Sequence, residues 1–122
     1  MLFVFDIDGT LDADPSVFLA LMQSLRAAGH RVAVATGYSG PVTPEAIAHK
    51  REYLANLGFG KAYDQLVVFA NPPTEAKAQW IKDSGADCLI DNDRANAQAS
   101  SGNCLVLLPW ASRVGHKSEG EL

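Results

Sequence analysis

Short apolar runs alternate along the chain with longer segments whose apolar residues recur at helical spacing. The runs contain few polar residues, which is typical of strands buried on both faces of a parallel sheet. The pattern predicts five strands, at Leu2–Asp6, Arg31–Ala35, Gln65–Ala70, Asp87–Ile90 and Cys104–Leu108.

Signals for helix starts and stops lie between the apolar runs. Asp14 and Thr43 each stand before a proline, which is the order expected for an N-cap and the first helical residue. Glycine follows the first two helical segments and favours a C-terminal stop. The predicted helices run from Pro15 to before Gly29, from Pro44 to before Gly58, over Thr74–Ser84 and over about Ala95–Ser100.

Strand and helix alternate five times with short connections. This pattern predicts an α/β fold: one doubly wound domain with a five-stranded parallel sheet and helices on both faces. In such sheets, ligands bind beyond the carboxyl ends of the strands, where the strand order switches direction. The polar residues that follow the strands are Asp6, Asp8, Gly9 and Thr10, then Thr36 and Gly37, then Asn71, and finally Asp91, Asn92 and Asp93.

Length and composition narrow the class of protein. The chain has 122 residues, of which 48% are hydrophobic and 20% charged, so it can build a core and is not a disordered chain. Its net charge of −4 lacks the basic excess of a nucleic-acid-binding domain. The length favours one domain, with no room for a second that selects substrates.

Cysteine usage and apolar run lengths bear on the compartment. Cys88 and Cys104 are too few for a disulfide framework and are expected to be buried, reduced thiols. The N-terminal run lacks the features of a signal peptide, and no apolar run reaches the length of a membrane span. We therefore expect a soluble, cytoplasmic protein without membrane partners.

The strand-end residues suggest phosphate chemistry. Asp6, Asp8 and Asp91 would bring hard oxygen ligands to one sheet edge, and such ligands suit Mg²⁺. A carboxylate beside the metal can attack phosphorus, while Thr36 and Lys77 can stabilise the phosphoryl group. Each residue alone is more often a cap, a turn or a solvated charge. Their joint occurrence at successive strand ends favours a site.

Four segments of the sequence resemble motifs of the haloacid dehalogenase-like (HAD) phosphohydrolase superfamily. They are the strand and DxDGTL of Phe3–Leu11, the strand ending in Thr-Gly at Val32–Tyr38, Lys77, and the acidic segment Cys88–Asp93. The resemblance covers residues 1–108. The short spacing between motifs leaves no space for an inserted cap domain, so it implies a small capless member.

The resemblance implies a role for each matching residue. Asp6 would be the nucleophile and a Mg²⁺ ligand, and Asp8 the general acid/base, whose carbonyl also binds the metal. Thr36 and Lys77 would hold the phosphoryl group, and Asp91 would be the third metal contact. The remaining implied positions are Gly9, Thr10 and Gly37 for substrate binding, and Asn92 and Asp93 for the metal site.

The function implied by the resemblance is a Mg²⁺-dependent phosphomonoester hydrolase that forms an aspartyl-phosphate on Asp6. The alternative is a weakly active HAD-fold domain that binds a phosphorylated ligand or protein partner. Residues 1–110 would form the catalytic core and residues 111–122 a polar tail. The substrate would be a small molecule, nucleotide or macromolecular phosphate. A nucleic-acid end and a homo-oligomer are left open.

Two further readings are disfavoured by the sequence. A receiver domain of two-component signalling would need its phosphate-accepting Asp after the third strand, which instead ends at Asn71-Pro72. Several basic residues could contact a ligand from the rim of the site, although solvated surface is the expectation for all of them: His49, Lys50, Arg51 and Arg94.

Overall fold

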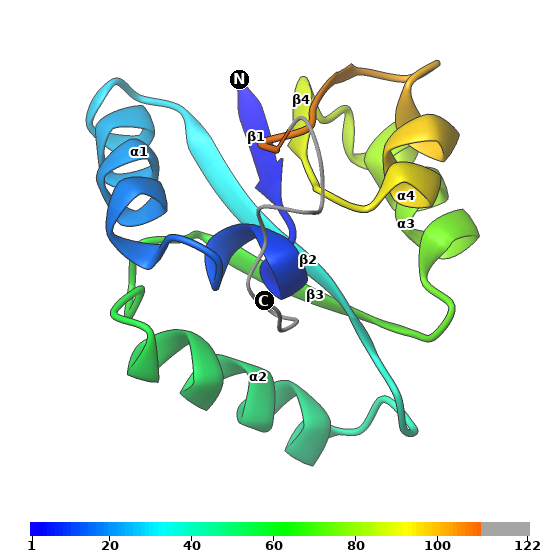
Figure 1. Cartoon of the computed structure of the whole chain (residues 1–122), viewed down its shortest axis with the longest axis horizontal. Coiled ribbons are helices and arrows are strands. Elements are labelled where there is room, and N and C mark those ends of the chain that lie inside the picture. Colours follow the sequence, from blue (N-terminus) through cyan, green and yellow to red (C-terminus); the bar gives the residue numbers. More distant parts are fainter. Residues whose placement is uncertain (111–122) are drawn as a thin grey trace.

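A computed structural model describes residues 1–110 of the chain. Five strands form one sheet in the order β3-β2-β1-β4-β5, and every neighbouring pair is parallel (Figure 1). The predicted α/β fold class is therefore confirmed. The strands are β1 (Leu2–Phe5), β2 (Arg31–Tyr38), β3 (Gln65–Ala70), β4 (Cys88–Ile90) and β5 (Leu105–Leu107).

Helices cover both faces of the sheet, as Figure 1 shows. Phe18 and Leu54 of the first two helices pack in one apolar cluster with residues of β1, β2 and β4. Ile81 of the third helix packs in a second cluster with other residues of these three strands. A tight turn, η1 (Ile7–Leu11), follows β1. The helices are α1 (Pro15–Ala27), α2 (Pro44–Asn56), α3 (Thr74–Ser84) and α4 (Arg94–Ser100).

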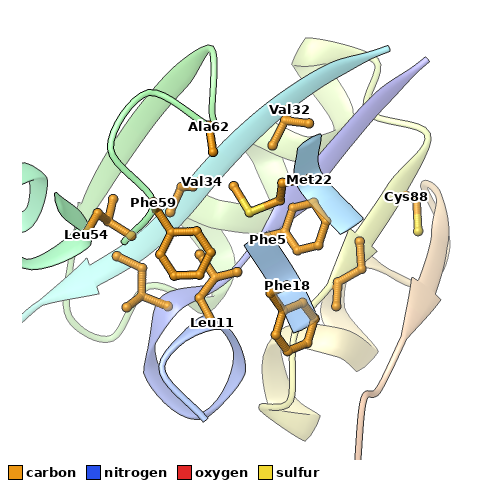
Figure 2. Packing of buried hydrophobic residues seen from close by; sticks show 12 residues of the cluster. Phe5, Leu11, Phe18, Met22, Val32, Val34, Leu54, Phe59, Ala62 and Cys88 are labelled. Carbon is orange, nitrogen blue, oxygen red and sulfur yellow. The ribbon is translucent and has the colours of Figure 1, made fainter. Parts of the chain in front are cut away.

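The larger apolar cluster fills the space between the sheet and the helices α1 and α2 (Figure 2). The rings of Phe5 in β1 and Phe18 in α1 meet edge to face, with their centroids 6.1 Å apart. Aromatic pairs in this arrangement add to the stabilisation that burial itself provides. This cluster holds β1 in place, and the candidate site lies at the carboxyl end of that strand.

The strand order places a switch between β1 and β4. From β1 the chain builds β2 and β3 on one side of it, then crosses over to build β4 and β5 on the other. The connections that leave β1 and β4 therefore diverge at their carboxyl ends. In doubly wound sheets this divergence creates the crevice in which ligands bind.

The second strand is longer than predicted. We expected Thr36 and Gly37 to follow the strand, yet both lie inside β2, where they pair with Val68 and Phe69 of β3. The physical reason is the partner strand: β3 supplies backbone hydrogen bonds as far as Tyr38. That pairing depends on residues far along the chain, so the local pattern did not indicate it.

Other expectations can be compared with the described residues. Both cysteines are free thiols, and Cys88 is buried as predicted, while Cys104 is half-buried. Burial raises the pKa of Cys88 to about 11. Within residues 1–110, no helix has both the length and the apolar character needed to cross a membrane. The predicted polar tail, residues 111–122, lies outside the described part of the chain.

Candidate functional site at the carboxyl edge of the sheet

Asp6 stands at the carboxyl end of β1, where the strand gives way to η1. Its backbone N–H donates to the carbonyl of Ile90, the last residue of β4, at 3.0 Å, so the two strand ends are joined here. Gly9 adopts φ 77°, a left-handed conformation that side chains disfavour. The turn thus folds back tightly and leaves Asp6 buried beneath it.

Lys77 reaches Asp6 from α3. Its Nζ donates to Oδ1 of Asp6 at 2.9 Å and to Oδ2 of Asp91 at 3.0 Å. The Lys77 side chain is fully buried, and a buried ammonium persists only when it is paired and hydrogen-bonded. The structure therefore brings together three residues that the sequence predicted as site residues.

Asp91 is held by the protein through both of its oxygens. Oδ1 accepts from the backbone N–H of Asp93 at 2.9 Å, and Oδ2 accepts from Nδ2 of Asn96 at 3.2 Å as well as from Lys77. Thr74 in turn donates to Oδ1 of Asn96 at 2.8 Å. Thr74 and Asn96 were missed by the sequence analysis, because only the packing of α3 against α4 aligns them.

The electrostatics of Asp6 reflect its burial. Loss of hydration raises the pKa of its carboxyl to about 7, although the ammonium of Lys77 opposes the shift. The nearby carboxylates of Asp91 and Asp8 raise it further. For Lys77, burial alone would lower the pKa, but Asp6 and Asp91 outweigh burial and raise it. Lys77 therefore stays charged.

Asp8 is placed differently from the two other aspartates. Its side chain is 69% exposed, and Lys77 does not contact it. Among residues 1–110, no three His, Cys, Asp or Glu side chains gather closely enough to hold a metal ion by themselves. Lys77 contacts Oδ1 of Asp6, which leaves Oδ2 available. Mg²⁺ commonly needs only one or two carboxylates when substrate phosphates complete its shell.

Thr36 and Gly37 sit deeper than the sequence suggested. Thr36 is fully buried, and its hydroxyl donates weakly to the carbonyl of Gly37 at 3.4 Å. A Cβ at Gly37 would overlap Oδ1 of Asn71 and approach Cγ of Pro73 at 3.0 Å. The roles predicted for Thr36 in phosphoryl binding and for Gly37 in substrate binding stay predictions.

Asn92 joins the two loops at the switch. Its backbone N–H donates to Oγ1 of Thr10 at 3.1 Å, and its Oδ1 accepts from the backbone N–H of Trp110 at 3.2 Å. Nε1 of Trp110 donates to the carbonyl of Gly9 at 2.8 Å. Nδ2 of Asn92 is buried and finds no hydrogen-bond acceptor within the described residues. Such a group is costly unless an acceptor arrives.

The helix α2 places Lys50 and Tyr53 beside η1, at the outer edge of the candidate site, which we call its rim. Nζ of Lys50 lies 4.0 Å from Oδ2 of Asp8 and 6.0 Å from the ring centroid of Tyr38. The hydroxyl of Tyr53 donates to Oδ2 of Asp12 at 3.1 Å, and desolvation together with Asp12 raises the pKa of Tyr53 to about 12.

The sequence predicted that four basic side chains near the rim are solvated, and only one of the four is largely covered by protein. The side chain of Lys50 is 14% exposed, so the expectation was wrong for this residue. His49, Arg51 and Arg94 are exposed. Position 50 lies four residues from both Ala46 and Leu54, which are buried, and this spacing was the signal available in the sequence.

Comparison with known proteins finds similarity in structure alone. No family model and no curated protein matches the sequence. A universal stress protein solved in complex with cAMP has a TM-score of 0.60 and 18% identity, covering 92% of this chain and 98% of its own. The chain shares the fold of that protein. A second structure, of the universal stress protein family from Burkholderia pseudomallei, has a TM-score of 0.48 and 14% identity, covering 87% of this chain and 92% of its own.

This finding corrects the family prediction. Universal stress proteins form a Rossmann-like superfamily that is distinct from HAD, so the assignment to HAD is wrong. The predicted phosphomonoester hydrolase with an aspartyl-phosphate on Asp6 is wrong with it, as is the alternative of a weakly active HAD domain. The physical reason is that doubly wound folds of different superfamilies all place polar residues after their strands, so position alone does not identify the chemistry.

Proposed function

We propose that this chain is a binding protein for a small phosphorylated ligand of the nucleotide class, which it takes up together with Mg²⁺. The site is the carboxyl edge of the sheet between β1 and β4. The observation that carries the proposal is Asn92, a buried residue at the switch in strand order whose Nδ2 lacks an acceptor within residues 1–110. A phosphorylated ligand would supply that acceptor.

The fold neighbour supports the class of ligand. The universal stress protein that shares this fold was solved in complex with cAMP, a small phosphorylated nucleotide. In doubly wound sheets the crevice at the switch is the usual place for such ligands. The two loops that leave β1 and β4 at the switch are tied to each other by Asn92 and Thr10.

The charges at the site support a role for Mg²⁺. When Asp6 is ionised, the carboxylates of Asp6, Asp8 and Asp91 outnumber the ammonium groups of Lys50 and Lys77, so a phosphate would then meet excess negative charge. Mg²⁺ would offset this charge, and Asp6 and Asp8 are the carboxylates that would hold it. Asp91 has both oxygens bound within the protein and would act by fixing Lys77 instead.

The test is ligand binding measured by calorimetry and thermal shift, with cAMP, AMP, ATP and inorganic phosphate, each with and without Mg²⁺. A ligand at about 100 times its Kd stabilises the folded state by about 2.7 kcal/mol, which is readily measured. We expect nucleotide binding that is strengthened by Mg²⁺.

Two variants sharpen the measurement. Asp8→Asn should reduce the Mg²⁺ dependence without loss of stability, because Asp8 is exposed. Asp83→Asn is the matched control, since Asp83 is an exposed aspartate of α3 outside the site. Absence of binding by every nucleotide, or the same response from both variants, would refute the proposal.

A further inference from the structure

Two lysines approach the site from opposite faces of the sheet. Lys77 comes from α3, which packs on the face formed by Val4 and Ala33, and Lys50 comes from α2, which packs on the face formed by Phe5 and Val34. They differ in what they have left to offer a ligand.

Lys77 is already committed. Its ammonium has two carboxylate partners at 2.9 and 3.0 Å, and its side chain has no exposed surface. An anion that approached it would have to displace a carboxylate from a desolvated pair, and breaking such a pair is costly. Lys77 is therefore poorly suited to capture a ligand's phosphate directly.

Lys50 is held in place without being saturated. It lies on the sheet-facing side of α2, between the buried residues Ala46 and Leu54, so its aliphatic stem is covered while its ammonium extends toward η1. Asp8 lies 4.0 Å away, which is beyond hydrogen-bond distance, so within residues 1–110 the N–H donors of Lys50 remain available to an anion.

The ring of Tyr38 limits where that ammonium can sit. Tyr38 ends β2, and its ring centroid lies 6.0 Å from Nζ of Lys50, at the outer range of a cation–π contact. Gly40 lies against the same ring, since a Cβ there would come within 3.1 Å of Cε2. The backbone at Gly40 thus restricts the position of the Tyr38 ring, and the ring in turn orients the ammonium of Lys50.

We infer that Lys50 is the cationic contact for the phosphate of the bound ligand and that Tyr38 is its positioning residue. The inference rests on the proposed function and adds to it the direction of the ligand, whose phosphate lies on the α2 side of η1. Lys77, which the sequence suggested for this role, instead stabilises Asp6 and Asp91.

The test compares Lys50→Gln with Arg51→Gln, using the nucleotide that binds the wild-type chain best in the presence of Mg²⁺. Both variants remove one positive charge from α2, but Arg51 is exposed and serves as the matched control. Loss of a charged hydrogen bond should raise the Kd of Lys50→Gln about tenfold or more. Arg51→Gln should bind as the wild type does, and both should keep the wild-type unfolding midpoint.

Three further variants test the roles of Tyr38 and Lys50. Tyr38→Phe keeps the aromatic face and should retain the wild-type Kd, whereas Tyr38→Leu removes that face and should raise the Kd. Lys50→Arg keeps the positive charge and should preserve part of the binding. An equal Kd for Tyr38→Phe and Tyr38→Leu, whether raised or unchanged, would contradict the positioning role of the ring.

The outcomes separate this inference from the proposed function. If the wild-type chain binds a nucleotide and Lys50→Gln binds equally well, the inference is overturned and the proposed function stands. An equal loss in Lys50→Gln and Arg51→Gln also overturns it, because only the overall charge would then matter. If the wild-type chain binds none of the nucleotides, both fail.

Discussion

Lys77 is the residue on which the site's internal structure depends. One ammonium satisfies two buried carboxylates that directly follow the neighbouring strands β1 and β4, and a chain of hydrogen bonds through Asn96 extends the network to Thr74. A buried pair of this kind need not add net stability relative to an apolar core. Removal of Lys77 alone is a different matter, because it leaves Asp6 and Asp91 buried without the cation that satisfies them.

We expect Lys77→Met to lower the free energy of unfolding by about 3–5 kcal/mol, because Asp6 and Asp91 would remain buried without a cation. Methionine has a similar volume, so a cavity contributes little to the change. Urea denaturation measures the effect. Lys82→Met, at an exposed position of the same helix, should change stability by less than about 0.5 kcal/mol. Equal stability of the two variants would exclude the described network.

At the scale of elements, the close approach between the end of β2 and the segment after β3 shapes the edge of the sheet. Gly37 pairs with Phe69 inside the β2–β3 ladder, and Asn71 donates its backbone N–H to the carbonyl of Tyr38 at 3.0 Å. The space where a side chain of residue 37 would lie is taken by Asn71 and Pro73. Glycine is favoured there because a side chain would displace the Asn71 amide and crowd Pro73, and not because of a left-handed turn.

We therefore expect Gly37→Ala to lower the free energy of unfolding by about 1–3 kcal/mol, as overpacking does. Gly102→Ala is the control, because a Cβ there meets no atom within 4 Å. Asn71→Ala in the Gly37→Ala background should recover part of the loss, since it removes the overlapping amide. Thermal or urea unfolding of the four proteins decides the matter, and a neutral Gly37→Ala would contradict the described packing.

At the scale of the whole molecule, the site joins segments from most of the described chain. The carboxyl ends of β1 and β4 lie at its centre, α3 and α4 support one side, α2 forms the rim on the other, and Trp110 connects the end of the described chain to η1. A change at one buried group therefore alters the free energy of unfolding of the whole fold. Global unfolding can for this reason report on the interactions within the site.

The pH dependence of unfolding should reveal Asp6. Because its pKa is about 7 in the folded chain and about 3.8 in the unfolded chain, the folded state binds the extra proton between these values. Its contribution is fully present below about pH 3.8 and is lost as the pH rises toward about 7. Over this window we expect the contribution of Asp6 to the free energy of unfolding to fall by a few kcal/mol.

The measurement is urea denaturation at a series of pH values for the wild-type chain and for Asp6→Asn. The difference between the two curves isolates Asp6 from the other carboxyl groups, and it should change with a slope of about one proton between pH 4 and 7. A difference that does not vary with pH would show that Asp6 ionises in the folded chain with an ordinary pKa.

Much of the fold could be predicted from local sequence. The strands and helices lie where apolar spacing and cap residues indicated, and Thr43 caps α2 by accepting from the N–H of Ala46, as its position before Pro44 suggested. Signals of this kind act within a few residues. Asp14 shows their limit, since it precedes α1 in the same way but makes no side-chain cap bond.

The sequence by itself determined the elements, their order and the collection of Asp6, Asp91 and Asn92 at one sheet edge, because parallel strands separated by helices must end on the same side. The sequence named Lys77 as a site residue, but only the tertiary structure decided that Lys77 is buried between two carboxylates and that Lys50 stands at the rim. Lys77 is 71 residues from Asp6, and no local spacing encodes a contact over that separation. The packing of α2 and α3 on opposite faces of the sheet makes that choice, and with it the charge that a ligand meets.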